Sequence, residues 1–190
     1  MAELIALDPD GPVVRALARG TRPEREAALR TLMEAHSPRL HGVAARMLGD
    51  AVLAEDVVQE TFLKAWDKAA DWQPGRAKFA TWLSRITVNA CLDRLRRVRP
   101  RTGEALPEIA DERPDAVLTL MRDDTRSEVR AAIKALPERQ RAALILATYD
   151  QVSQSEGADI LGITEGAYES LLVRARRNLR ETFKETRHAV

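Results

Sequence analysis

The sequence predicts an all-α protein built of two small helical domains that a flexible acidic linker joins. Two features of composition favour helices over sheets: only 4% of the 190 residues are aromatic, and 31% are charged, with abundant Ala, Leu, Arg and Glu. Apolar residues recur at helical spacing on both sides of a proline-containing acidic stretch, which separates the two domains. A hydrophobic content of 45% can supply a real core.

The first long helix is predicted after an N-terminal extension at residues 1–22, at the start of a domain that covers residues 23–99. We expect it over Pro23–Leu48, because proline suits a first helical turn and Gly49 offers a left-handed stop. Ser37–Pro38 has the pattern of a second helix start. This segment is therefore expected to form two helical pieces or one kinked rod.

A helix, a loop and a further helix are predicted to complete the first domain. Asp50 is the expected N-cap of a helix from Ala51 to about Ala70, and a loop with a Pro–Gly pair follows at Asp71–Ala77. The next helix, about Lys78–Val98, is apolar on two sides and is therefore predicted to be central in a small bundle. Its stripes are Phe79, Trp82, Leu83, Ile86 and Ala90 on one side, and Val88, Leu92 and Leu95 on the other.

One face of the helix from Ala51 to Ala70 has a pattern that core packing does not explain. At 100° per residue, the apolar side chains between Ala54 and Trp66 fill one broad arc, which suits burial. Leu63 instead projects from the middle of the polar arc. The residues around it are Asp56, Gln59, Glu60 and Asp67. This face fits a basic helical partner outside the domain or, as the simpler alternative, a solvated surface.

The linker is placed at residues 100–124, where three prolines and many acidic residues leave little periodicity. The second domain is placed at residues 125–187. It is expected to begin with a helix over Thr125–Ala135 and to continue with a helix that starts at Pro137.

The end of the second domain has the pattern of a helix-turn-helix unit. A short helix is expected to end at a turn at Gly162, Thr164 is an expected N-cap, and a longer helix begins at Glu165. A helix, a tight turn and a longer helix in this order are typical of that motif.

Charge, cysteine content and hydropathy exclude several classes of protein. The net charge of +1 gives no global sign of nucleic-acid binding, so any basic surface has to be local, such as "RLRRVRPR" at the end of the helix predicted over Lys78–Val98. The single cysteine, Cys91, excludes an internal disulfide and suits a reducing compartment. No segment has a basic signal-peptide start or the ~18 apolar residues that span a bilayer. We therefore expect a cytoplasmic protein with no membrane contact of its own.

No catalytic, metal or cofactor site is predicted, and an enzyme is the least favoured class. His36 and His41, two of the three histidines, lie five positions apart, which splays them around a helix instead of pairing them as metal ligands. The carboxylates have no partner pattern for acid–base chemistry, and no glycine-rich phosphate loop occurs.

Four motifs occur in a fixed order along the chain: "AEDVVQETFLKAW", "FATWLSRITVNACLDRLRR", "LPERQRAALIL" and "ADILGITEGAYESLLVRARRNLR". With these motifs, from about Ala28 to Phe183, the chain resembles the extracytoplasmic-function (ECF) sigma factors of bacterial transcription. The resemblance implies a promoter-specificity subunit that binds core RNA polymerase and promoter DNA. It also implies an anti-sigma factor as inhibitory partner, and we expect a monomer when the chain is free.

In this family the acidic face binds the clamp helices of the polymerase's largest subunit, an arginine-rich coiled coil, which would make Leu63 an apolar anchor inside a polar rim. The residues assigned to this contact are Asp56, Gln59, Glu60, Leu63 and Asp67. The loop and the helix after it correspond to the part that melts the minus-ten element, where a flipped base needs stacking and hydrogen bonds. The residues assigned to it are Trp72, Gln73, Arg76, Lys78, Arg85, Asn89 and Arg96.

The second domain corresponds to the family's minus-thirty-five recognition unit, with Thr164 to about Arg177 as the helix that enters the major groove. The residues assigned to this contact are Thr164, Glu165, Gly166, Glu169, Ser170, Arg174, Arg176 and Arg177.

This unit departs from the family pattern. Gly157 stands where the family commonly has isoleucine, which is expected to remove a packing group. "AYESLLVRAR" stands where it often has "TVKSRLHRAR", so Glu169 and Leu171 replace a lysine and an arginine. We therefore expect weaker binding to the upstream element.

The altered recognition helix keeps one alternative open, a sigma mimic that sequesters an anti-sigma factor without binding DNA. The arginine-rich end after Asn89 and the intact acidic face on the second helix argue against it.

Overall fold

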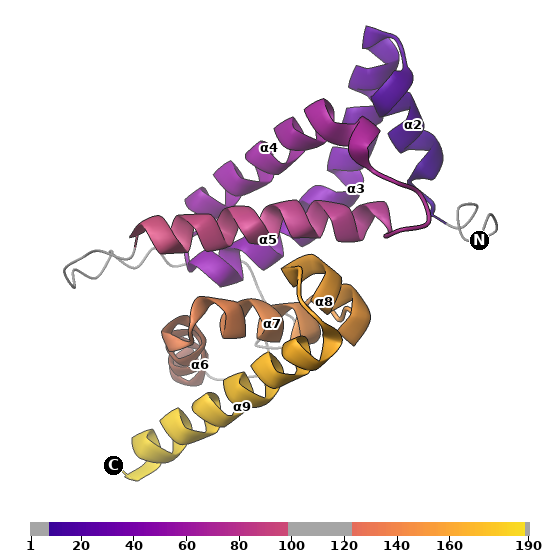
Figure 1. The fold of residues 1–190 in the computed structure, drawn as a ribbon. Helices are drawn as coiled ribbons and strands as arrows, with labels where there is room; N and C mark the ends of the chain where they lie inside the picture. The colour runs from indigo at the N-terminus through magenta and orange to yellow at the C-terminus, as the bar shows by residue number, and fades with distance from the viewer. Residues whose placement is uncertain (1–7, 99–122, 189–190) are drawn as a thin grey trace.

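The computed structural model describes residues 8–98 and 123–188, and within these two ranges all regular secondary structure is helical (Figure 1). This agrees with the predicted all-α class. The elements are α2 (Gly11–Arg19), α3 (Arg22–Leu48), α4 (Ala51–Lys68), the 3-10 turn η1 (Ala69–Asp71), α5 (Phe79–Val98), α6 (Asp123–Ala135), α7 (Glu138–Thr148), α8 (Gln154–Leu161) and α9 (Glu165–His188).

The short helix α2 lies in the N-terminal extension, residues 1–22, where the sequence analysis predicts no helix. Its nine residues are too few to form a stable helix alone, so its stability has to come from packing. Val14 and Leu17 are fully buried against the bundle, in one cluster with side chains of α3, α4 and α5.

Helix α3 is continuous, so the predicted interruption at Ser37–Pro38, with two separate helical pieces, is wrong, and the single-rod alternative holds. A capping box between Thr21 and Glu24 starts the helix, and Gly49 ends it in the left-handed conformation with φ 68°. Proline removes one backbone donor from the helix interior. Packing of the helix on both sides of Pro38 compensates for this loss, since Leu32 and Leu40 are each buried.

Helices α3, α4 and α5 form the first bundle (Figure 1). The Asp50 carboxylate accepts a hydrogen bond from the Leu53 amide at 3.0 Å, which is the predicted N-cap of α4. The apolar arc of α4 is buried as expected, at Ala54, Val57, Val58, Phe62 and Ala65.

The second domain has the predicted order of helices. Ser153 and Glu156 form a capping box at the start of α8, Gly162 ends it with φ 62°, and the Thr164 hydroxyl accepts from the Ala167 amide at the start of α9. The linker predicted at 100–124 lies outside the described residues, apart from its last two positions, which belong to α6.

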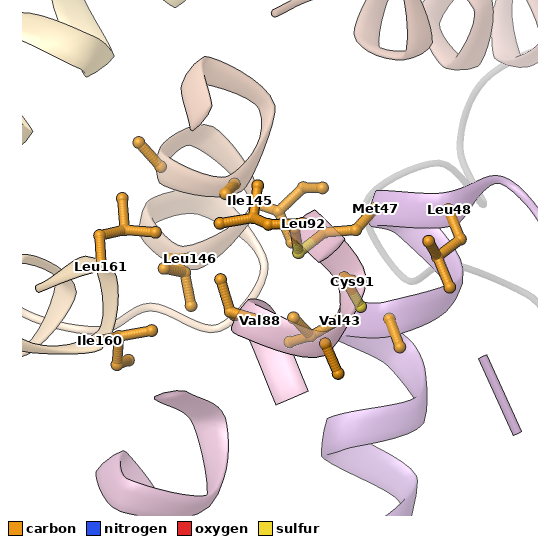
Figure 2. Close-up of a cluster of buried hydrophobic side chains, with 14 of the residues drawn as sticks. Val43, Met47, Leu48, Val88, Cys91, Leu92, Ile145, Leu146, Ile160 and Leu161 are labelled. Carbon is orange, nitrogen blue, oxygen red and sulfur yellow. The ribbon is translucent and has the colours of Figure 1, made fainter. Parts of the chain in front are cut away.

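The two domains pack against each other and share one buried cluster (Figure 2). This cluster explains why α5 is apolar on two sides, because the stripe of Val88, Leu92 and Leu95 on α5 faces the second domain. The labelled side chains that meet there include Val43 and Met47 of α3, Val88 and Leu92 of α5, Ile145 and Leu146 of α7, and Ile160 and Leu161 of α8.

Candidate functional site

The outer face of α4 exposes an apolar side chain among acids, as the sequence predicts. Leu63 is 67% exposed, and Asp56, Gln59 and Asp67 also lie at the surface. Sequence reasoning missed Val52, which is 59% exposed and lies on the same stripe at helical spacing from Asp56. Its position before the acidic residues was the signal that could have identified it.

Glu60, another residue assigned to this face, is paired within the bundle. Its carboxylate accepts hydrogen bonds from Lys64 Nζ at 2.6 Å and from Arg94 Nη1 at 2.9 Å. These donors, Lys64 first, lower the pKa of the Glu60 carboxyl below its ordinary value. The charge of Glu60 is therefore already balanced within the bundle, by a residue of its own helix and by one of α5.

Trp72, which the sequence analysis assigns to a promoter base, lies in the core of the free protein. Its side chain is 7% exposed, and its indole N–H donates to the Ala77 carbonyl at 3.1 Å. Its ring meets Phe79 edge-on, with the ring centroids 5.7 Å apart. An indole with its donor satisfied and its ring packed has no free face for a base.

The other residues assigned to the minus-ten element lie at the surface. Gln73, Arg76 and Lys78 of the loop are exposed, as are Arg85, Asn89 and Arg96 of α5. Arg96 forms an ion pair with Asp93 on its own helix.

Part of this basic edge contacts the second domain. Lys78 Nζ forms an ion pair with Glu156 Oε1 of α8 at 3.0 Å. Lys78 lowers the pKa of the Glu156 carboxyl. The Arg85 guanidinium lies beside Gly162, in the turn of the helix-turn-helix unit. The arrangement thus brings two basic residues of the first domain against α8 and the turn after it.

The assigned residues of α9, and Thr164 before it, point outward. Thr164, Glu165, Gly166, Glu169, Ser170, Arg174, Arg176 and Arg177 are all exposed. Tyr168, Leu172 and Ala175 form the buried side of the same helix.

Gly157 lacks the packing group of an isoleucine, but it leaves no gap in the second domain. A Cβ atom built on Gly157 would lie 2.3 Å from Cζ of Tyr168, so the tyrosine ring fills the space that an isoleucine side chain would need. The Tyr168 hydroxyl donates to the Ala143 carbonyl at 3.1 Å, and burial raises the pKa of Tyr168 to about 12. The glycine and the tyrosine therefore form a complementary pair.

Within the described ranges, no group of three or more His, Cys, Asp or Glu side chains is arranged to hold a metal ion. Nor does any helix there have the length and hydropathy needed to cross a membrane. Cys91 is fully buried, and burial raises the pKa of its thiol to about 12, which keeps it protonated at neutral pH.

Comparison with known proteins identifies the family. The family Sigma-70 region 2 matches residues 32–101, and Sigma-70, region 4 matches residues 126–179. The chain is 36% identical over 154 residues to the ECF RNA polymerase sigma factor SigE of Mycolicibacterium smegmatis, a match that covers 79% of the chain and 59% of SigE. It thus spans less than two thirds of that relative.

Other matches cover nearly whole proteins. The ECF RNA polymerase sigma factor RpoE of Cereibacter sphaeroides is 31% identical over 167 residues, 87% of this chain and 92% of RpoE. The sigma factor RpoE of Bartonella quintana, solved with the anti-sigma factor NepR, is 27% identical with a TM-score of 0.65, covering 82% of this chain and 96% of that one. Two matched sigma regions and these relatives agree, and the chain belongs to the ECF family of RNA polymerase sigma factors.

Proposed function

We propose that this chain binds core RNA polymerase and directs it to a set of promoters, working in the cytoplasm without catalytic activity of its own. Residues 23–99 would contact the polymerase and the minus-ten element, and residues 125–187 the minus-thirty-five element. One observation carries the proposal: the chain combines an exposed leucine on an acidic helix face with a helix-turn-helix unit whose second helix exposes arginines. In vitro transcription with purified core polymerase tests it, because the proposal requires promoter-dependent transcripts.

The polymerase contact is proposed for the face of α4 formed by Val52, Asp56, Gln59, Leu63 and Asp67. An exposed apolar side chain inside a polar rim is the composition of an interface hot spot. The acids are complementary to an arginine-rich coiled coil such as the clamp helices. Glu60 would act at the edge of this face, since Lys64 and Arg94 already hold its carboxylate.

Replacing Leu63 with arginine tests the contact without disturbing the core. Because Leu63 is exposed, the variant should fold normally, yet its affinity for core polymerase should fall by at least about tenfold. Met33→Arg is the matched control, since Met33 is a partly exposed apolar residue of α3 outside the proposed face. Equal binding of Leu63→Arg and wild type would refute the assignment.

For the minus-ten element we propose contacts from the exposed loop residues and from one edge of α5. The Asn89 amide can both donate to and accept from a base edge, while Arg76, Arg85 and Arg96 suit phosphates. Gln73 and Lys78 complete the set. Trp72 would fix the conformation of the loop from the core side, through its buried ring and its hydrogen bond to the Ala77 carbonyl.

For the minus-thirty-five element we propose that α9 enters the major groove. Arg174, Arg176 and Arg177 would contact DNA on its later turns, and Glu169 can accept from a cytosine amino group. Amides at Thr164, Glu165 and Gly166, together with the Ser170 hydroxyl, would hold a phosphate at the start of the helix. The acidic Glu169 makes this binding weaker than that of a basic recognition helix.

An anti-sigma factor is the proposed inhibitor. The Bartonella quintana neighbour was solved with one, and here the ion pair between Lys78 and Glu156 already occupies part of the proposed minus-ten edge. An inhibitor that holds the two domains together would keep this edge covered. A sigma mimic is not favoured, because the recognition helix is repacked around Tyr168 and still exposes its arginines.

A further inference from the structure

Asp8, which precedes α2, uses both of its carboxylate oxygens in hydrogen bonds. Oδ1 accepts from the Asp10 amide at 3.0 Å, within the turn that starts α2. Oδ2 accepts from the amide of Phe79 at 2.7 Å, although the two residues are 71 positions apart in the sequence. Phe79 is the first residue of α5. Asp8 therefore ties the start of α2 to the start of α5.

This bond replaces a local helix cap. The first amides of a helix have no partner within the helix, and a side-chain acceptor from the preceding residue normally satisfies one of them. Lys78 precedes α5, and its ammonium group can only donate hydrogen bonds, so it cannot accept one from a helix amide. The carboxylate of Asp8 supplies the missing acceptor, and its negative charge suits the positive end of the helix.

A second contact from the same segment also reaches the start of α5, through His36. Asp10 Oδ2 lies 2.9 Å from His36 Nε2, and both side chains are mostly buried. The His36 ring meets Phe79 edge-on at 6.3 Å. Phe79 in turn contacts Trp72 edge-on and stacks on Trp82 with the ring centroids 5.3 Å apart.

The loop between Trp72 and Phe79 is thus fixed at both ends. Inside it, the Trp72 indole donates to the Ala77 carbonyl, and the Arg76 amide donates to the Gln73 carbonyl at 3.2 Å. What remains exposed includes the side chains proposed above for the minus-ten element. The segment that holds the loop lies before residue 32, where the match to sigma-70 region 2 begins.

We propose that Asp8 is a positioning residue for minus-ten recognition. By capping α5 from the N-terminal segment, it holds the loop in the one arrangement that presents Gln73, Arg76 and Lys78 to the non-template strand. Asp8 itself contacts no DNA. The inference rests on the proposed function, because it assigns a source of precision to the same promoter contact.

The test uses the full chain assembled with core polymerase of the source bacterium. The probe is a pool of fork-junction DNA whose single-stranded minus-ten segment carries random bases, and the bound DNA is sequenced. The variants are Asp8→Ala, which removes the acceptor, and Asp8→Asn, which keeps an amide oxygen for the Phe79 amide. Asp50→Ala is the matched control, because Asp50 makes the same kind of cap at the start of α4, away from the loop.

We expect Asp8→Ala to lower the enrichment of the preferred bases by about fivefold, the factor that corresponds to the loss of one helix cap. Asp8→Asn and Asp50→Ala should retain the wild-type preference, and all variants should assemble with polymerase equally. Preference is measured among DNA molecules that compete in one tube, so it does not depend on the fraction of folded protein.

Two results would overturn this inference and leave the proposed function standing. One is an unchanged base preference for Asp8→Ala, and the other is an equal loss of base preference for Asp8→Ala and Asp50→Ala. If the wild-type holoenzyme selected no bases at all, the proposed function would fail and this inference with it.

Discussion

Arg39 of α3 and Asp150, which follows α7 in the other domain, form a two-point ion pair. Arg39 Nε donates to Asp150 Oδ1 at 2.5 Å and Nη2 donates to Oδ2 at 2.7 Å. Beside it, the Arg46 guanidinium stacks on the Tyr149 ring at 3.5 Å from the centroid. Gly42 makes room for this ring, because a Cβ atom there would lie 2.2 Å from the tyrosine hydroxyl. One short segment therefore joins the second domain to α3 through both charge and shape.

Breaking this ion pair should weaken the contact between the domains. The Asp150 side chain is 2% exposed, against 31% for Arg39, so Arg39→Met leaves a buried carboxylate without its partner. We expect the free energy of unfolding in urea to fall by about 3 kcal/mol. Asp150→Asn in the same background should recover part of the loss. Simple addition of the two single effects would contradict a direct coupling.

Arg22→Ala is the control for this experiment. Arg22 forms an ion pair with Glu26, but its side chain is 87% exposed. Exposed pairs of this kind contribute little because solvent screens them. The variant should unfold at the same urea concentration as the wild type.

The complementary pair of Gly157 and Tyr168 predicts a second coupling. Gly157→Ile should drive its side chain into the tyrosine ring, and Tyr168→Val should leave a cavity, each costing about 3 kcal/mol or more of unfolding free energy. The double variant restores the pairing of a large and a small side chain that the family more often has. It should therefore be more stable than either single variant, as urea unfolding can measure. A double variant less stable than both would show that the two positions do not compensate.

Local signals in the sequence predicted most of the helices. Asp50, Gly49 and Gly162 act through bonds within their own turns, so residue type and spacing are enough to identify them. The predicted break at Pro38 was wrong because packing on both sides of the proline keeps α3 helical through it.

The site was less predictable where distant residues decide it. Trp72 is buried because Phe79 and the N-terminal segment cover it, and no local pattern reports such a contact. Glu60 is paired because α5 brings Arg94 to it across 34 positions. The exposure of Leu63, in contrast, could be predicted from the helical period alone, because the position of a residue on its own helix sets the direction of its side chain.

Trp72 should affect stability before it affects DNA binding. Trp72→Ala removes a buried ring and should lower the free energy of unfolding by about 3–5 kcal/mol. Trp72→Phe keeps most of the packing and loses the bond to the Ala77 carbonyl, about 1 kcal/mol. Gln73→Ala, at an exposed neighbour, is the control and should leave unfolding unchanged. A Trp72→Ala variant of normal stability that no longer opens promoters would restore the base-contact hypothesis.

Glu60 predicts a dependence of stability on pH. Its pKa is lowered from 4.5, by Lys64 first and then by Arg94. A carboxyl whose pKa is lower in the folded than in the unfolded state stabilises the fold above the unfolded pKa, and this contribution is lost as the pH falls through the folded pKa. Because the Glu60 side chain is 39% exposed, solvent screening limits the contribution to less than about 1 kcal/mol.

Urea unfolding of the wild type and of Glu60→Gln measures this contribution to the free energy of unfolding. Both proteins are compared at neutral pH and at several pH values below 4.5. The wild type should be the more stable at neutral pH, and the difference should shrink as Glu60 becomes protonated. Arg94→Met removes one of the two donors, so it should reduce the pH dependence while Lys64 preserves the rest. A difference between wild type and Glu60→Gln that stayed constant with pH would mean that the ion pairs do not stabilise the charged form.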